Sequence, residues 1–183
     1  MIERAALAEL LIFWIVWFYP FVFRAPHWQK REHVTVAGPS LAGLLIEIFA
    51  VFLAFYFHGP VAGMAGLTVS IVFGILAVVM GWSAVTHLGR QLRIFAGLYR
   101  DHELVRTGPY AVVRHPIYAS LLAMLLCTIF AWSRWPWALV SIAVFLLGTE
   151  IRVRTEDRLL ASRFGEAFQD WQRKTPAYLP LVR

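Results

Sequence analysis

The chain has 183 residues, of which 60% are apolar and 15% are charged. A soluble domain is about half apolar and about a quarter charged, so this chain has more apolar surface than one core can bury. The composition therefore predicts a membrane domain and excludes an intrinsically disordered protein. Cys127 is the only cysteine, which excludes both a disulfide scaffold and a cysteine-based zinc site.

Five apolar stretches follow one another along the chain, at residues 5–23, 41–57, 67–84, 117–132 and 135–149. A helix rises about 1.5 Å per residue, and a bilayer core is about 30 Å thick, so we expect five membrane helices. The first stretch could also be a signal peptide, but it has no net-positive start and no small-residue cleavage site. Ser133 and Arg134, followed by Pro136, predict a tight hairpin between the last two helices.

The basic residues predict how the chain is oriented in the membrane. Three polar segments, 24–35, 87–115 and 151–183, hold 15 of the 17 Lys and Arg residues. Five membrane helices place these segments on one face, and the positive-inside rule makes that face cytoplasmic. We therefore expect the N-terminus outside the cytoplasm, and the C-terminus and any active site on the cytoplasmic side.

The C-terminal segment is amphipathic. Leu160, Phe164, Phe168 and Trp171 recur at spacings of four, four and three between charged neighbours, which predicts a surface helix that begins near residue 151. The predicted fold class is all-α: a polytopic integral membrane protein with about five transmembrane helices and a cytoplasmic C-terminal amphipathic helix.

The partners suggested by a basic chain are membrane lipids rather than nucleic acid, because orientation and anionic lipid already account for its cations. The sequence contains no glycine-rich dinucleotide or phosphate loop and no His-Glu-x-x-His motif. No two of its six histidines are four residues apart. We therefore expect neither a nucleic-acid partner nor a bound metal.

The segment richest in reactive side chains runs from His102 to Tyr118. Pro116 is suited to the first turn of the fourth membrane helix, with Arg114 and His115 directly before it. Cations and free backbone N–H groups at a helix N-terminus favour a bound carboxylate or phosphate. The alternative is a basic cap whose side chains extend to lipid headgroups.

A second charged cluster follows the fifth membrane helix. Arg152 and Glu156 are four residues apart, so they lie on one helical face. They form either a surface ion pair or, together with the first cluster, a site for a zwitterion. Glu9 and Glu47 lie within membrane helices, where each needs a buried partner or access to water. The sequence assigns neither a role.

The motifs His102-x-Leu104-Val105-x-x-Gly108-Pro109-Tyr110, Arg114-His115-Pro116-x-Tyr118 and Glu156-Asp157 occur in this order. Together they resemble the isoprenylcysteine carboxyl methyltransferase family. These integral membrane enzymes use S-adenosylmethionine and are related to the phospholipid N-methyltransferases. The resemblance covers residues 102–180. We expect one membrane domain, residues 1–183, in which residues 1–86 supply three membrane helices without a family motif. The resemblance implies that residues 87–183 form the cofactor-binding half.

The resemblance also implies a site for S-adenosylmethionine formed by His102, Glu103, Leu104, Val105, Tyr110, His115, Pro116, Ile117, Tyr118 and Glu156. Glu156 suits the ammonium group of this cofactor, and His115 with the start of the following helix suits its carboxylate. Tyr110 and Tyr118 suit the adenine or the sulfonium.

Arg152 corresponds to the arginine associated with the acceptor, which the resemblance implies is a lipidic or isoprenylated molecule such as a prenylcysteine carboxylate. Arg152 and Glu156 are therefore the candidate catalytic residues. Asp157, Ser120 and Arg106 depart from the family pattern and leave the acceptor open. A phospholipid amine, a small thiol, an NADPH-dependent reductase of the sterol-reductase type and a non-catalytic membrane scaffold remain alternatives.

Overall fold

The computed structural model describes residues 2–23, 33–36, 38–59, 63–93 and 96–179. Five long helices run through these residues: α1 (Ile2–Phe23), α2 (Gly38–Tyr56), α3 (Gly63–Leu88), α4 (Pro116–Trp132) and α5 (Trp135–Phe164). The smaller elements are α6 (Glu166–Lys174), the 3₁₀ helices η1 (Gly89–Gln91) and η2 (Gly108–Ala111), and the strands β1 (His33–Val36) and β2 (Gly97–Tyr99). The predicted all-α membrane class is confirmed.

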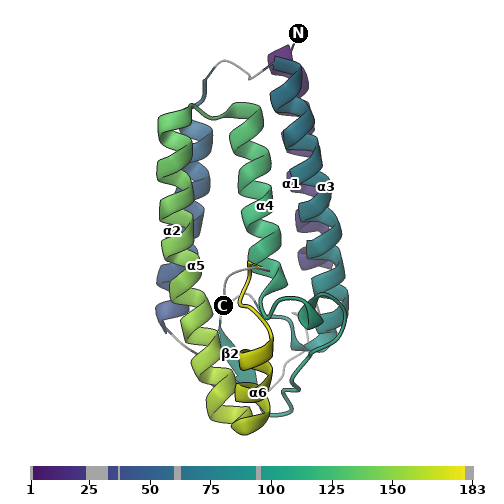
Figure 1. Ribbon diagram of the computed structural model, residues 1–183, viewed down its shortest axis with the longest axis vertical. Helices are drawn as coiled ribbons and strands as arrows, with labels where there is room; N and C mark the ends of the chain where they lie inside the picture. The colour runs from purple at the N-terminus through teal and green to yellow at the C-terminus, as the bar shows by residue number, and fades with distance from the viewer. Residues whose placement is uncertain (1, 24–32, 37, 60–62, 94–95, 180–183) are drawn as a thin grey trace.

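The five long helices run alternately up and down the length of the molecule (Figure 1). Of these, α1, α2, α3 and α5 are long and apolar enough to cross a membrane, and α4 is a shorter apolar helix of 17 residues. Large apolar side chains such as Ile15, Val79 and Leu139 are exposed along their outer faces, where lipid would cover them. The chain therefore forms a multi-pass helical membrane protein.

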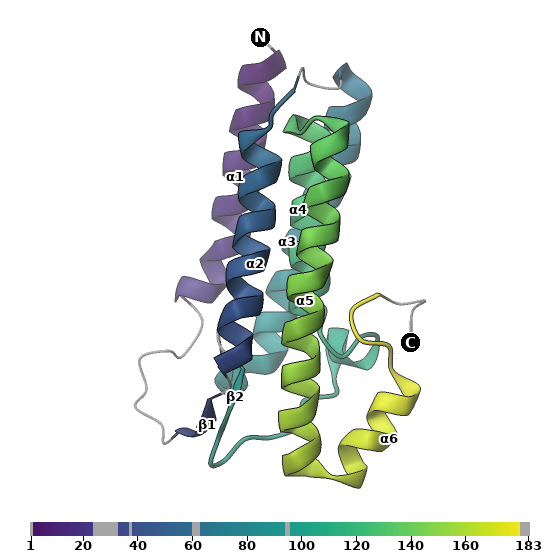
Figure 2. The same cartoon turned by 90° about the vertical axis from the view of Figure 1, so that its left-hand side faces the viewer.

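The predicted hairpin between the last two membrane helices is only partly correct. A short turn at Ser133 and Arg134 does join α4 to α5. However, α4 packs mainly against α3, whereas α5 packs mainly against α2 (Figure 2). Apolar contacts join the α3–α4 pair to the α2–α5 pair, and Leu125 of α4 and Phe145 of α5 are buried in one cluster. The backbones of α4 and α5 stay apart along most of their length, and side chains from both helices fill the space between them.

The packing of α5 on α2 depends on two glycines. A Cβ atom at Gly148 would lie 2.7 Å from the carbonyl oxygen of Gly43, and one at Gly43 would lie 2.7 Å from that of Gly148. Such distances are shorter than van der Waals contact, so the two backbones touch only because both residues lack a side chain. The close approach brings the polar residues one turn further along each helix within reach of one another.

The predicted C-terminal amphipathic helix is present as α6, but it begins later than predicted. No new helix begins near residue 151, because α5 continues without interruption to Phe164. Gly165 then ends it with φ of 51°, in the left-handed region that favours glycine, and α6 follows at an angle. Phe168 and Trp171 on α6 are buried against the rest of the protein. The amphipathic pattern therefore covers the end of α5 and all of α6, which packs on the bundle after the bend at Gly165.

The three basic segments do lie at one end of the bundle, as far as they are described. The segment from η1 to the start of α4, and α6 with its following residues, meet at the lower end in Figure 1. At the same end, β1 and β2 form a small antiparallel pair, for which the sequence predicted no strands (Figure 2). Residues 24–32 of the first basic segment lie outside the described residues.

Candidate active site

A pocket lies at this end of the bundle, between α3, the segment that contains β2, α4, α5 and α6. Ten of the eleven predicted site residues line it: His102, Glu103, Leu104, Val105, Tyr110, His115, Ile117, Tyr118, Arg152 and Glu156. Pro116 does not line it; it begins α4 and is buried. The empty space between the lining residues, out to the solvent at the mouth, is about 810 Å³.

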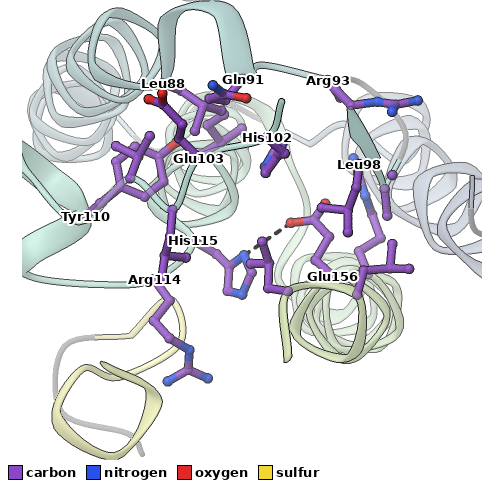
Figure 3. Close-up of a pocket in the computed structure, with 18 of the residues that line it drawn as sticks. Leu88, Gln91, Arg93, Leu98, His102, Glu103, Tyr110, Arg114, His115 and Glu156 are labelled. Atoms are coloured by element: carbon purple, nitrogen blue, oxygen red, sulfur yellow. Dashed lines mark ion pairs between the residues drawn. The ribbon is translucent and has the colours of Figure 1, made fainter. Parts of the chain in front are cut away.

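Two of the lining segments, 102–118 and the last turns of α5, are joined by His115. Its Nδ1 lies 3.2 Å from a Glu156 oxygen (Figure 3). Its Nε2 lies 2.9 Å from an oxygen of Asp157. His115 precedes Pro116 and is 5% exposed. Both ring nitrogens are thus directed at carboxylates of α5, so His115 fixes the position of Glu156 at the pocket wall.

The charge on His115 follows from these contacts. Burial alone would lower the pKa of the imidazole, but hydrogen bonds to Asp157 and Glu156, and the negative charge of both, raise it from 6.5 to about 9. His115 is therefore protonated at neutral pH. For Tyr110, burial and then the charge of Glu156 raise the pKa of the phenol well above its usual value. Tyr110 is therefore a neutral hydroxyl.

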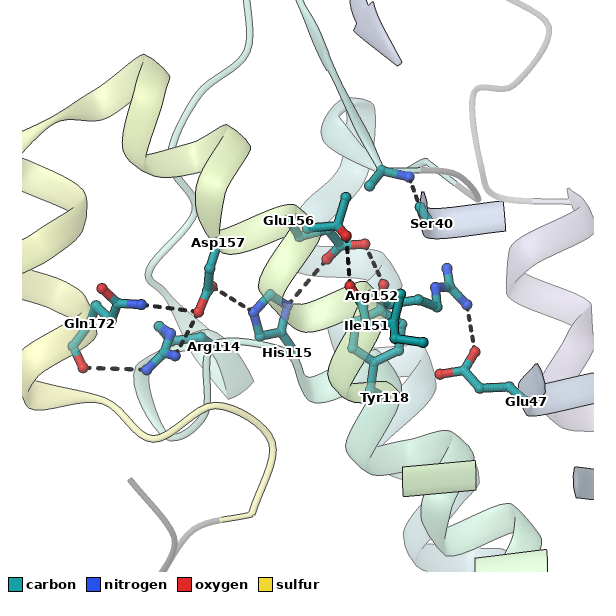
Figure 4. A network of polar contacts seen from close by, with 12 residues as sticks. Ser40, Glu47, Arg114, His115, Tyr118, Ile151, Arg152, Glu156, Asp157 and Gln172 are labelled. Carbon is teal, nitrogen blue, oxygen red and sulfur yellow. Dashed lines mark hydrogen bonds and ion pairs between the residues drawn. The ribbon is translucent and has the colours of Figure 1, made fainter. Parts of the chain in front are cut away.

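Tyr118 connects Glu156 to Arg152. Its hydroxyl donates a hydrogen bond to Glu156, and its ring lies 4.7 Å from the Arg152 guanidinium carbon (Figure 4). Arg152 is itself buried, with Nη1 2.7 Å from an oxygen of Glu47 on α2. The interpretation of Arg152 and Glu156 as an exposed surface ion pair is therefore wrong. Glu47, to which the sequence assigned no role, is the partner of Arg152.

Asp157, the first departure from the family pattern, belongs to a separate part of the network. It accepts hydrogen bonds from Arg114 at 2.8 Å and from Gln172 of α6 at 3.1 Å, in addition to its contact with His115. The backbone N–H groups of Arg114 and His115 donate to the carbonyls of Pro176 and Ala177. The residues after α6 are thus fastened to the start of α4, and Asp157 holds this part of the wall together.

Ser120 and Arg106 are the other two departures. Ser120 is buried, and its hydroxyl accepts a hydrogen bond of 3.2 Å from Trp17 of α1. A glycine at this position would have no side chain to accept that bond. Ser120 therefore ties α1 to α4. Arg106 is exposed, and nothing in the structure explains its presence. Glu9, the other intramembrane glutamate, accepts a hydrogen bond of 2.7 Å from Ser70 and lies outside the pocket.

The remaining predicted residues form the apolar side of the pocket. Tyr110 is buried with Phe168 and Trp171, and Leu104, Val105 and Ile117 pack against this cluster. The His102 ring lies 6.3 Å from that of Phe164. Glu103 is exposed at the rim. The segment 102–105 thus supplies a wall with a polar edge.

Gln91 and Trp171 are among the lining residues that the sequence analysis did not assign to the site. Gln91 and Trp171 are both buried at the pocket, and Gln91 Oε1 and Trp171 Nε1 have no hydrogen-bond partner among the described residues. A buried polar atom without a partner costs free energy unless a ligand or water satisfies it. Trp171 was assigned only to an amphipathic pattern. Gln91 carries no signal in a single sequence, because only the fold brings it to the pocket.

These features define a class of protein: a multi-pass helical membrane protein with a charged pocket built at one end of its bundle. A family model described as the isoprenylcysteine carboxyl methyltransferase family matches residues 69–162, just over half of the chain. The chain belongs to this family, as the sequence motifs indicated. The matched segment runs from α3 to α5 and includes all eleven predicted site residues.

Three curated relatives match parts of the chain. The cobalt-zinc-cadmium resistance protein CzcN of Cupriavidus metallidurans is 38% identical over 95 residues, 49% of this chain and 43% of that protein. The protein-S-isoprenylcysteine O-methyltransferase of Schizosaccharomyces pombe is 32% identical over 83 residues, 45% of this chain and 35% of that protein. The nickel-cobalt-cadmium resistance protein NccN of Alcaligenes xylosoxydans is 34% identical over 95 residues, 49% of this chain and 44% of that protein.

The matched segments span less than half the length of each of these relatives. Two of the relatives are named for metal resistance. Within the described residues, no group of three or more His, Cys, Asp or Glu side chains is arranged to hold a metal ion.

Proposed function

We propose that this protein is an S-adenosylmethionine-dependent membrane methyltransferase whose acceptor is a lipidic molecule with a carboxylate, of the prenylcysteine type. The observation that carries the proposal is the pocket, in which Glu156 and Arg152 occur together with the 102–118 segment. Membership of the family supports the same reaction. In this proposal residues 87–183 form the cofactor-binding half of a single membrane domain.

The residues of the pocket fit the proposed cofactor. Trp171 Nε1 and Gln91 Oε1 offer one donor and one acceptor that lack partners among the described residues, as a purine requires. Glu156, whose side chain is 26% exposed, would accept the cofactor's ammonium group. The backbone N–H of Ile117, in the first turn of α4, would donate to its carboxylate, because the N–H of Tyr118 already donates to the carbonyl of His115. His115 acts in this proposal by holding Glu156.

When bound, S-adenosylmethionine supplies a methyl group activated on a sulfonium. The protein's part is to align an acceptor with that group and to exclude water. An acceptor carboxylate is ionised at neutral pH, so no general base is needed. Arg152 would orient it through the planar fork of the guanidinium, which matches a carboxylate.

The depth of these residues favours an acceptor that arrives from the membrane. Because α5 runs toward the pocket end, Arg152 lies one turn deeper in the bundle than Glu156, about 6 Å by helix rise. Beyond Arg152 and Thr149 most of the buried side chains are apolar, with Phe145 fully buried. A polar cofactor at Glu156 and a lipid-borne carboxylate at Arg152 would therefore meet from opposite sides.

An amine acceptor fits less well. It would need a base to remove a proton, and the two candidates are Glu156 and Asp157. Glu156 is already bound to Tyr118 and His115, whereas Asp157 is bound to Arg114, His115 and Gln172. These contacts with donors and cations make both carboxylates poor proton acceptors.

Transfer of a labelled methyl group tests the proposed function. The purified chain would be incubated with labelled S-adenosylmethionine and, separately, N-acetyl-S-farnesylcysteine, phosphatidylethanolamine and a small thiol. We expect label on the farnesylcysteine carboxylate, and much less with Arg152→Lys. Transfer only to the amine or the thiol would overturn the carboxylate assignment, and no transfer to any acceptor would count against methyltransferase activity.

We further propose that the pocket faces the cytoplasm, because the pocket end carries the described parts of the basic segments. Reporter fusions at Arg183 and in the turn between Gly59 and Gly66 should then report opposite sides of the membrane, with Arg183 inside. A result that places both fusion sites on the same side of the membrane would contradict the five-helix topology. Arg183 on the outside would contradict the orientation.

A further inference from the structure

We propose that Glu47 of α2 is a positioning residue, which holds Arg152 in the orientation that selects an acceptor carboxylate. This inference rests on the proposed function and extends the site beyond the family-matched segment, which begins at residue 69. It assigns part of the active site to a helix that carries no family motif.

The contacts of Glu47 fix the Arg152 guanidinium on one side. Glu47 is 1% exposed, its Oε2 lies 2.7 Å from Arg152 Nη1, and its Oε1 accepts a hydrogen bond of 2.9 Å from Thr149 (Figure 4). Tyr118 supports the guanidinium through its ring face. Thr149 of α5 therefore orients the Glu47 carboxylate, and this carboxylate orients Arg152 of the same helix.

The backbone is arranged to permit this contact. Glu47 lies one turn beyond Gly43 on α2, and Arg152 lies one turn beyond Gly148 on α5. At these two glycines the backbones of the helices come into direct contact. With a side chain at either glycine the helices would separate, and Glu47 could no longer reach both Thr149 and Arg152.

Stability alone does not account for the ion pair. Apolar side chains of similar volume often replace a buried ion pair without loss of stability, because the charges must be desolvated. Glutamate and arginine within membrane helices are especially costly, and they commonly mark a functional site. Arg152 also lines the pocket. An arginine has five N–H donors in one plane, so fixing Nη1 on Glu47 sets the direction of the others.

The test compares an acid with its ester. Binding of N-acetyl-S-farnesylcysteine and of its methyl ester would be measured on the purified full chain with S-adenosylhomocysteine present. We expect the wild type to bind the acid at least about tenfold more tightly than the ester, as a charge-assisted contact implies. Glu47→Gln should bring this ratio close to one. A purely structural role would weaken acid and ester alike and leave the ratio unchanged.

Three further variants complete the experiment. Glu9→Gln removes another intramembrane carboxylate, outside the pocket, and should keep the wild-type ratio. Thr149→Val, nearly isosteric, loosens Glu47 without removing a charge and should lower the ratio by a smaller factor, even if Glu47→Gln fails to fold. Arg152→Lys should also lose the preference, and adding Glu47→Gln to it should change nothing more, because the two act as one unit.

The proposal would be overturned if Glu47→Gln kept the wild-type ratio of acid to ester affinity. It would also be overturned if the wild type bound the acid no more tightly than the ester. Failure of the proposed function is distinguishable, because it would appear as absence of S-adenosylhomocysteine binding in the same wild-type samples.

Discussion

His115 lies between Glu156 and Asp157, with one ring nitrogen 3.2 Å from the first carboxylate and the other 2.9 Å from the second. The contact joins the residues before α4 to consecutive residues of α5. Because Glu156 lines the pocket and Asp157 faces Arg114 and Gln172, one imidazole connects the ligand-facing wall to the part that α6 supports. The shape of the pocket therefore depends on the charge of this histidine.

The first prediction concerns pH. The pKa of His115 is raised from 6.5 to about 9 in the folded protein, so its contribution to stability is complete below pH 6.5. This contribution is lost as pH rises from about 6.5 through about 9, and at about 1.36 kcal/mol per pKa unit it is on the order of 3 kcal/mol. The melting temperature in detergent should fall across this window.

His115→Gln provides the comparison, because a glutamine can still donate a hydrogen bond but does not titrate. Its melting temperature should be lower than that of the wild type at pH 6 and should change little between pH 6.5 and 9. An equally steep loss of stability in both proteins would mean that another group titrates.

The second prediction concerns Glu156. Glu156→Gln retains an oxygen for the Tyr118 hydroxyl but removes the charge proposed to bind the ammonium group of the cofactor. A charge-assisted hydrogen bond contributes about 1.5–3 kcal/mol, so affinity for S-adenosylhomocysteine should fall by roughly ten- to a hundredfold. Isothermal titration calorimetry measures this directly. Unchanged affinity would place Glu156 outside the cofactor site.

The third prediction concerns Trp171. Trp171→Phe keeps an aromatic ring beside Phe168, from which the Trp171 ring lies 5.9 Å, but removes the buried Nε1 donor. If a cofactor satisfies this donor, the affinity for S-adenosylhomocysteine should fall by about three- to tenfold, equivalent to about 0.5–1.5 kcal/mol. A loss of melting temperature without a loss of affinity would show that Trp171 only packs.

The sequence predicted the membrane helices well because long apolar stretches determine them directly. Their partners were less predictable. Ser133 and Arg134 indicated a hairpin, but the packing of α5 on α2 depends on Gly43 and Gly148, whose close approach exists only in three dimensions. The end of α5 was also missed, because hydropathy drops after Thr149 although the helix continues to Phe164.

For the site, too, some residues could be predicted from the sequence and others could not. The motifs between His102 and Glu156 identified ten lining residues, because the reactive side chains are close together in the sequence. Glu47 and Trp171 come from α2 and α6, on either side of these motifs, and no local pattern links them to the pocket. The pairing of Arg152 with Glu47 joins residues 105 positions apart.

The fourth prediction tests the contact between α2 and α5. Gly148→Ala would place a Cβ 2.7 Å from the Gly43 carbonyl oxygen, so the helices must separate. Overpacking of this kind costs about 1–3 kcal/mol, and the melting temperature should fall. Gly38→Ala, at the start of α2, is the control, because a Cβ there meets no atom within 4 Å. Equal effects of the two substitutions would contradict the proposed close approach.

Calorimetry on the purified wild-type chain, with S-adenosylhomocysteine and NADPH as separate ligands, tests the central claim most directly. The arrangement of Glu156, Gln91 and Trp171 around the pocket predicts binding of S-adenosylhomocysteine with one site per chain, and no binding of NADPH. Binding of NADPH without S-adenosylhomocysteine would contradict the claim in favour of a reductase. Binding of neither ligand by folded protein would contradict it in favour of a non-catalytic scaffold.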